Sequence, residues 1–168
     1  EIVPFPPLPV HSAEPEALLE LCRRAEQSAF SIESRSVCVE GEVYCFESLE
    51  DGEWNAFCLE YFKPGIRKIG HDVKPLMRRL LDEGKAFGDF VFDTALAAYL
   101  LDSLGGNPPL ERCAAKFLGV SIPDPVQNPA VLAQLSTKLR EELKNSGMLA
   151  LYETVELPLC EVLADMEH

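Results

Sequence analysis

Paired metal-ligand motifs are missing from this sequence. Its six cysteines and three histidines are scattered, and no two cysteines stand at the C-x-x-C spacing that zinc sites and redox motifs use. Three of the cysteines stand in β-type runs beside large apolar residues. We therefore expect reduced, unpaired thiols, as in a cytoplasm, and no zinc site. His71 is the only candidate for a general base, and a surface or capping role is the simpler interpretation of it.

Long hydrophobic runs are missing as well. No apolar stretch reaches the roughly 18 residues that a membrane span needs. The first residues, EIVPF, contain neither the basic start nor the apolar core of a secretion signal. We expect no membrane association and a cytoplasmic location. The sequence also has no phosphate-binding G-x-x-x-x-G-K-[ST] loop and no dinucleotide-binding glycine pattern, which argues against nucleotide sites of these two kinds. It has no internal repeat, which argues against a solenoid.

Basic residues are scarce in the first third of the chain. Residues 1–60 contain three Lys or Arg and thirteen Asp or Glu, and residues 61–168 contain twelve and fifteen, within a total charge of −13. So acidic a surface repels phosphate backbones and does not by itself bind nucleic acid. Two interpretations stay open for it: a solvated, solubilising face, or a docking surface for a basic partner.

What is present is the pattern of one α/β domain. With 168 residues, 47% hydrophobic and 26% charged, the chain is long enough to bury a core without disulfides or metals. A Pro-rich lead-in over 1–11 precedes a helix that Ser12 caps and that runs to about Gln27. Short alternating runs then predict antiparallel strands. These strands are expected at 28–34, 36–40, 42–48 and 55–61, where 36–40 and 42–48 form either two strands or one bulged strand.

The second half of the chain predicts alternating strands and helices. Residues 67–70 and 88–92 read as short strands, and Asp72 and Asp93 are expected to cap the helices that follow each of them. Later helices are expected to begin at Asn-Pro pairs, because proline is favoured in the first helical turn. These pairs are Asn107-Pro108 and Asn128-Pro129. Strands that come first and helices that come later indicate an α/β or α+β domain.

The last predicted helix covers 148–166 and keeps an apolar stripe up to His168. Pro158 should kink it, because the proline ring displaces the hydrogen bond to the Thr154 carbonyl. A stripe that reaches the chain end needs something to cover it. We infer that the chain is part of a longer polypeptide; a helix that folds back onto its own domain is the alternative.

Four motifs in order carry a family resemblance. They are AFSIES at 29–34, KIGHDVKPL at 68–76, FDTALAAYLL at 92–101 and LYETVELPLCEVLADME at 151–167. Together they resemble the 3′–5′ exonuclease-type domain of bacterial DNA polymerase I, the family A polymerases. The resemblance implies a ribonuclease H-like α/β fold, with a mixed sheet of about five strands (three antiparallel, then β-α-β) flanked by helices. It also implies an exonuclease-like domain over 1–147 and, over 148–168, the start of a helical connection into a polymerase module.

The sequence departs from the family pattern between the predicted third and fourth strands. Members of the family usually have a helix there. Here only residues 62–66, with Pro64-Gly65 inside, separate the predicted strands 55–61 and 67–70. So short a connection has no room for a helix. We therefore expect one edge of the sheet to be less covered.

The resemblance also locates a nuclease site. In the family, carboxylates hold two divalent metal ions that hydrolyse a phosphodiester bond. The first-strand Asp and Glu fall at Ser31 and Glu33, the second-motif Asp at Leu76, and the third-motif Tyr and Asp at Ala130 and Gln134. Three of the four carboxylates and the phenol that orients water are thus replaced. One carboxylate cannot hold two divalent cations against their repulsion, so we expect no catalytic residues and no cofactor in this domain.

Three acidic residues are the weak candidates for a relocated metal site: Glu33, Asp72 and Asp93. Asp72 and Asp93 stand where helix N-caps are expected, and a cap contributes about 1 kcal/mol without any metal. Leu76 at a ligand position favours apolar burial instead. We therefore expect the former site to be repacked as core.

For function, the resemblance implies a vestigial, catalytically inactive proofreading domain whose partner is the polymerase module of the same polypeptide. The whole protein would be a DNA-directed DNA polymerase of replication and repair, with DNA and Mg²⁺ bound outside this fragment, which we expect to be a monomer. The only basic stretch, 63–85, either contacts DNA or that module or is a solvated helix face. Two alternatives stay open: an active metal-dependent 3′–5′ exonuclease with relocated ligands, or an acidic protein-interaction module.

Overall fold

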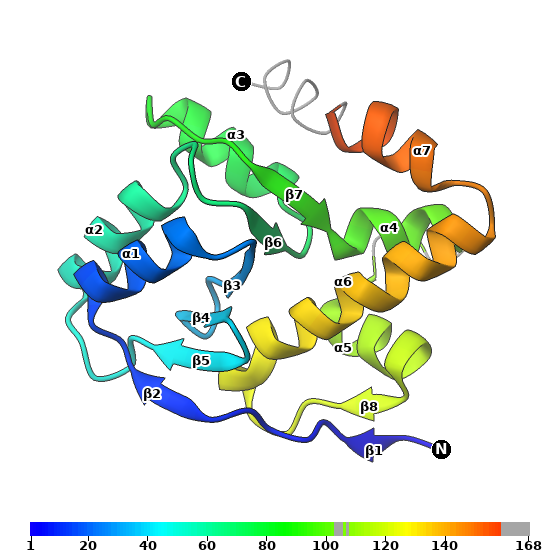
Figure 1. Ribbon diagram of the computed structural model, residues 1–168, viewed down its shortest axis with the longest axis horizontal. Coiled ribbons are helices and arrows are strands. Elements are labelled where there is room, and N and C mark those ends of the chain that lie inside the picture. The colour runs from blue at the N-terminus through cyan, green and yellow to red at the C-terminus, as the bar shows by residue number, and fades with distance from the viewer. Residues whose placement is uncertain (103–105, 107, 159–168) are drawn as a thin grey trace.

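A mixed six-stranded sheet forms the middle layer of the computed structural model, which describes residues 1–102, 106 and 108–158 (Figure 1). Its strand order is β2-β5-β4-β3-β6-β7. Strands β3, β4 and β5 are antiparallel neighbours, whereas β3, β6 and β7 run parallel, as does the edge strand β2 with β5. The bounds are β2 Val10–Ser12, β3 Ser28–Ser31, β4 Ser36–Val39, β5 Glu42–Cys45, β6 Lys68–Gly70 and β7 Phe90–Asp93. The predicted α/β class is confirmed, with six strands in this sheet instead of about five.

Helices cover both faces of the sheet (Figure 1). One face carries α1 (Pro15–Arg24), α2 (Asp51–Tyr61) and α3 (Lys74–Asp82). The other carries α4 (Thr94–Leu101), α5 (Leu110–Cys113) and the long α6 (Asn128–Asn145). Smaller elements complete the described chain: β1 Val3–Pro4 paired with β8 Val120–Ser121, η2 Ala114–Leu118, η3 Pro125–Gln127, α7 Leu149–Leu151 and η4 Tyr152–Glu156. None of the helices in the described ranges combines the length and apolarity that crossing a bilayer requires.

Each face of the sheet has its own apolar core. The core under α1, α2 and α3 is aromatic, and Phe57 stacks on Tyr61 with ring centroids 5.3 Å apart. The core under α6 is mainly aliphatic and is built on Leu135, Leu139 and Leu143, all fully buried. Burying one such side chain contributes roughly 1.5–3 kcal/mol. The two cores therefore fix how α3 and α6 sit over the sheet.

One predicted strand is in fact a helix. Residues 55–61 belong to α2, so the strand prediction there is wrong. Consequently the expected departure from the family pattern is also wrong, because a helix does lie between the third strand β5 and the next strand β6. It packs beside α1 over the aromatic core (Figure 1), so the predicted loss of helical cover does not occur.

The sequence around α2 explains why a helix forms. Glu50 and Glu53 form a capping box, in which each side chain accepts a hydrogen bond from the other residue's backbone N–H. Trp54, Phe57 and Tyr61 recur at helical spacing and are all buried. An apolar face of this kind gains more from packing on the sheet as a helix than it would as an edge strand.

Two local boundaries also differ from expectation. Ser12 pairs with Cys45 in the sheet and does not cap α1. That helix begins at Pro15 without a side-chain cap, because proline is well placed in the first helical turn. Of the two possibilities for 36–48, the structure has two strands, β4 and β5, and the turn between them places Glu40 and Gly41 at φ of 51° and 79°.

Several expectations lie outside the described residues. They concern the Asn107 cap, Cys160, and the apolar stripe and motif beyond Pro158. Before Pro158, α7 continues directly into η4, a π-helical turn.

Candidate functional site

The first two motifs of the exonuclease resemblance meet at one concave pocket of about 530 Å³. Ser31 and Glu33 reach it from the end of β3, and Asp72 and Leu76 reach it from the start of α3. We call it the Leu76 pocket. Its other lining residues are Phe30, Ile32, His71, Val73, Pro75, Arg79, Pro109, Leu110, Glu111, Asn128 and Leu132.

Asp93 does not line this pocket and has a structural role. It is 2% exposed, and its carboxylate accepts hydrogen bonds from four backbone N–H groups. They belong to Asp72 at 2.7 Å, Val73 at 3.0 Å, Ala95 at 3.0 Å and Leu96 at 3.4 Å. Burial raises the pKa of Asp93, and these amides oppose the shift. The predicted cap of α4 is thus confirmed, and the same carboxylate also holds the start of α3.

Asp72 does line the pocket but caps nothing, so its predicted cap role is wrong. Its φ of 58° places it in the left-handed region, which Asp tolerates better than most residues. Helix α3 then begins at Lys74, with Val73 before it making no side-chain cap bond. Asp93 already accepts from the N–H groups at this helix start, and the Asp72 side chain lines the pocket that Glu33 also lines.

The two residues named for the third motif do not line the Leu76 pocket. Ala130 and Gln134 line a different cavity of about 500 Å³, next to the Pro-rich lead-in. Asn128 and Leu132 of α6 face the Leu76 pocket instead. Two residues along a helix correspond to a rotation of roughly 200°, so residues 128 and 132 lie on a different face of α6 from residues 130 and 134.

The donors in the Leu76 pocket do not fit a two-metal centre. Such a centre needs a ring of oxygen ligands around Mg²⁺ or Mn²⁺. Leu76 and Leu132 offer none, and Asp93 is turned toward backbone amides. Within the described ranges, no three His, Cys, Asp or Glu side chains gather in a way that could hold a metal ion.

His71 is fully engaged in hydrogen bonds at the pocket wall. Its Nε2 lies 2.8 Å from the Pro108 carbonyl and therefore donates to it, while Nδ1 lies 2.7 Å from the Thr94 hydroxyl. Both ring nitrogens are thus used to join the end of β6 to α4 and to the segment before α5. This geometry favours the structural interpretation of His71 over a general base.

Cysteine nucleophiles are disfavoured by burial. Each described cysteine is a free thiol. Desolvation raises the pKa of Cys22 and Cys58 to about 12 and of Cys38 and Cys113 to about 11. A thiol is nucleophilic only as the thiolate, so these groups are inert near neutral pH.

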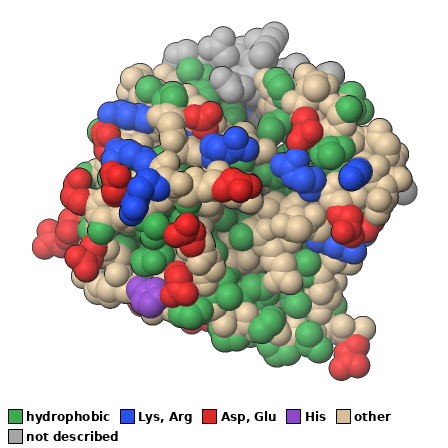
Figure 2. All heavy atoms as spheres, in the orientation of Figure 1, with side chains coloured by type: hydrophobic (Ala, Val, Ile, Leu, Met, Phe, Trp, Pro, Cys, Tyr) green, Lys and Arg blue, Asp and Glu red, His purple; other side chains and the backbone are tan. Residues whose placement is uncertain are grey.

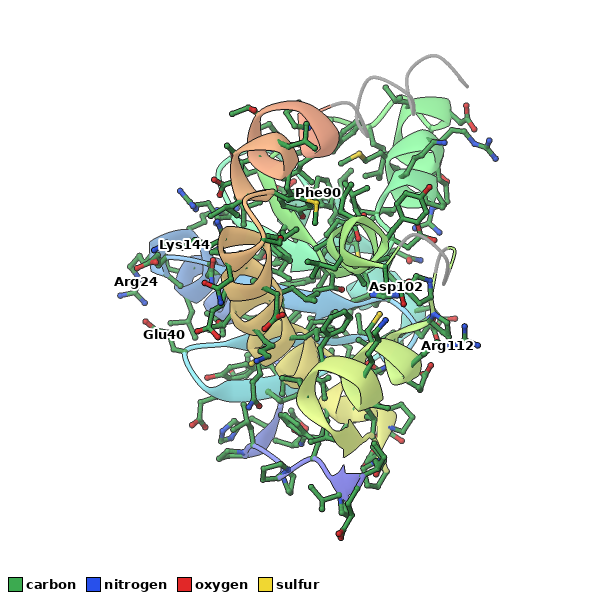
Figure 3. The ribbon with its side chains drawn as sticks, turned by 90° about the vertical axis from the view of Figure 1, so that its right-hand side faces the viewer. Arg24, Glu40, Phe90, Asp102, Arg112 and Lys144 are labelled. Atoms are coloured by element: carbon green, nitrogen blue, oxygen red, sulfur yellow. The ribbon has the colours of Figure 1, made fainter. Side chains whose placement is uncertain are left out.

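The last described segment is anchored to the sheet. Tyr152 is fully buried, and its hydroxyl donates to the Asp93 carbonyl at 3.1 Å and accepts from the Asp93 N–H at 2.7 Å. Its ring packs on Phe92 at 5.0 Å. The guanidinium of Arg140 lies over the ring of Phe92 and forms an ion pair with Glu153. Figure 3 shows α7 at one end of the molecule and β1 at the other.

Lys and Arg side chains do not form a continuous basic patch on the face drawn in Figure 2. They lie among acidic side chains in its upper half. Within the stretch 63–85, Lys63 pairs with Glu60 at 2.6 Å and Lys85 with Glu83 at 2.9 Å. This interspersed pattern is typical of a solvated surface.

The fold and pocket define an α/β domain whose concave site opens beside the ends of β3 and β6. No protein-family model matches the chain, and no curated protein matches it in sequence. Solved structures do match. One is described as the POL domain of Pol1 from M. smegmatis in complex with DNA primer-template and dNTP, with a TM-score of 0.74 and 24% identity over 95% of this chain. Another is a protein from Bifidobacterium adolescentis, with a TM-score of 0.58 and 18% identity over 91% of this chain.

These likenesses show the fold and nothing finer, because both identities are low. The chain spans 32% of the Pol1 chain and 46% of the Bifidobacterium chain. Its fold is therefore one that also occurs within a structure of a DNA polymerase I.

Proposed function

We propose that the chain is a nuclease-inactive 3′–5′ exonuclease-like domain, ribonuclease H-like in fold, from a DNA polymerase I. One observation carries the proposal: Ser31 and Leu76 line one pocket with Glu33, at positions where the resemblance expects metal-binding carboxylates. The likeness to the Pol1 structure, which was solved with primer-template and dNTP, supports the polymerase setting. The proposed domain covers 1–147, and 148–168 begins the connection to the polymerase module.

Inactivity follows from cation chemistry. Two divalent ions roughly 3.5–4 Å apart repel each other strongly and need several shared carboxylates to hold them. Only Glu33 remains of the expected set, and Asp72 and Glu111 are the further carboxylates that line the pocket. Leu76, at a former ligand position, stabilises the fold by burial and removes like-charge repulsion.

The proposed role of the domain is structural. The contacts of Tyr152 and Arg140 support it, because they fix the direction in which the chain leaves the sheet toward the polymerase module. In this proposal the whole protein is a cytoplasmic DNA-directed DNA polymerase of replication and repair. It binds DNA, and it uses Mg²⁺ in its polymerase module. The domain itself is monomeric and makes its partner contacts within the same polypeptide.

A nuclease assay tests the proposal. The 168-residue chain is incubated with 5′-labelled single-stranded DNA in the presence of Mg²⁺ or of Mn²⁺, and products are resolved on a sequencing gel. We expect no cleavage above the chelator control in either metal. The Glu33→Ala variant is the matched control for contamination. Metal-dependent cleavage that disappears in Glu33→Ala would show a live nuclease with relocated ligands and would overturn the proposal.

A further inference from the structure

The Leu76 pocket gathers charged side chains that lack partners. Glu33, Asp72, Glu111 and Arg79 line it, and we call these four the pocket rim. None of the four side chains makes an ion pair or a hydrogen bond within the described part of the chain, whereas many other charged residues there are ion-paired. With three carboxylates and one guanidinium, the rim is net negative at neutral pH.

A buried amide lies in the same pocket. Asn128, at the start of α6, is 7% exposed and lines the pocket. Its side chain forms no hydrogen bond with any described residue. A side-chain amide offers two donors and an acceptor, and those of Asn128 are open to the pocket although most of the residue is buried. An amide without hydrogen bonds to the protein can bond to a ligand that carries an amide or carbonyl group.

The floor of the pocket is apolar. Leu76 of α3 and Leu132 of α6 both line it, as do Ile32 and Leu110. A cavity of about 530 Å³ with such a floor has room for an aliphatic side chain together with a longer charged one. The site therefore combines an apolar base, an amide and a negative rim.

We propose that the Leu76 pocket binds a short basic peptide segment in which an aliphatic residue neighbours a lysine or arginine. The aliphatic side chain packs on Leu76 and Leu132, the cationic group pairs with the carboxylates of the rim, and the peptide backbone bonds to the Asn128 amide. This binding activity goes beyond the structural role proposed above and does not depend on it.

Phosphate-bearing ligands fit this pocket poorly. The net negative rim repels them. Helix N-termini attract anions, but the N–H groups at the start of α3 already bind the Asp93 carboxylate at 2.7 and 3.0 Å. In addition, α6 has a proline, Pro129, in its first turn and so lacks one amide donor there. Electrostatics therefore distinguishes a basic peptide from a nucleotide.

Fluorescence anisotropy tests the proposal with two labelled probes of equal length, acetyl-Gly-Leu-Lys-Leu-Lys-Gly-amide and its counterpart with Glu for Lys. The 168-residue chain should bind the Lys peptide saturably and bind it more weakly at high salt, and it should not bind the Glu peptide. Glu33→Gln with Glu111→Gln should weaken binding about fivefold, as expected for two exposed ion pairs. Asn128→Ala should weaken it about tenfold through the lost amide bonds.

Matched controls separate the pocket from the general acidity of the chain. Glu47→Gln removes an exposed carboxylate outside the pocket, and Asn145→Ala removes an exposed amide at the other end of α6. Both variants should bind the Lys peptide as the original chain does. Equal weakening by Glu47→Gln and by the rim variants would overturn the proposal in favour of a diffuse acidic surface. Tighter binding of thymidine monophosphate than of the Lys peptide would also overturn it.

Discussion

Lys68 shows at the residue scale how a charge is accommodated in the core. The side chain is fully buried, and its ammonium donates to the carbonyl groups of Gly88 at 2.5 Å and Lys63 at 3.2 Å, with Phe62 at 3.5 Å. It also lies 5.2 Å from the centroid of the Phe90 ring. These contacts join β6 to two loops. Desolvation nevertheless lowers the pKa of Lys68 to about 8, and the Asp89 carboxylate partly opposes this shift.

This lowered pKa predicts a stability that depends on pH. Between pH 8 and 10.5 the unfolded chain holds the Lys68 proton and the folded chain releases it. Stability therefore rises with pH in that window, by about 1 kcal/mol per unit. The buried cysteines, whose folded pKa values are raised, act in the opposite direction above about pH 9.

A variant isolates the lysine from the thiols. Urea denaturation of the original chain and of Lys68→Met is compared from pH 7 to 10. The difference in unfolding free energy, original minus variant, should rise as pH increases above about 8, because the cysteines contribute equally to both chains. A difference that stays flat over this range would show that Lys68 remains protonated in the folded state.

At the element scale, α2 marks the limit of pattern reasoning. In 55–61 the apolar residues Phe57, Leu59 and Tyr61 alternate, which is typical of a strand. The same residues together with Trp54 also fit a helix, and a window of seven cannot decide between the two periods. The decisive information lay outside the window, in the capping box of Glu50 and Glu53.

The candidate site was predictable where its residues stand at the ends of sheet strands and near helix starts. Ser31, Glu33 and Leu76, which the motifs named, line one pocket, because the motifs span the ends of β3 and β6. Asn128 and Leu132 were missed. Helix α6 is buried along most of its length and apolar on more than one side, so apolar periodicity did not identify the face toward the pocket.

The hydrogen bonds between the Tyr152 hydroxyl and the Asp93 backbone should hold η4 against the sheet. Tyr152→Phe removes the hydroxyl that serves both backbone groups of Asp93, which leaves a buried N–H and a buried carbonyl without that partner. We expect a loss of about 1–3 kcal/mol in unfolding free energy. Amide hydrogen exchange around α7 and η4 should also become faster.

Tyr99→Phe is the matched control for this variant. Tyr99 is 43% exposed on α4, so removal of its hydroxyl should change stability by less than about 0.5 kcal/mol. If Tyr152→Phe were as mild as Tyr99→Phe, and exchange around α7 unchanged, the anchor would not hold the exit of the chain.

At the scale of the whole molecule, charge decides what the isolated chain can bind. The sequence has a net charge of −13, and basic side chains such as Lys63 and Lys85 are paired with carboxylates. Affinity for DNA depends on free cations that displace counterions from phosphates. The chain by itself should therefore bind a DNA backbone weakly, although it shares its fold with part of a DNA polymerase structure.

We accordingly predict that the 168-residue chain forms no saturable complex with a 20-nucleotide DNA, single- or double-stranded, at 0.15 M salt and protein concentrations up to about 100 μM. Anisotropy of labelled DNA measures this, with the same titration at low salt as a check that weak attraction is detectable. Saturable binding at 0.15 M would contradict the prediction. The exposed Arg67 lies in the basic stretch 63–85, so loss of that complex in Arg67→Gln would place the contact there and would give the domain a direct role in holding DNA.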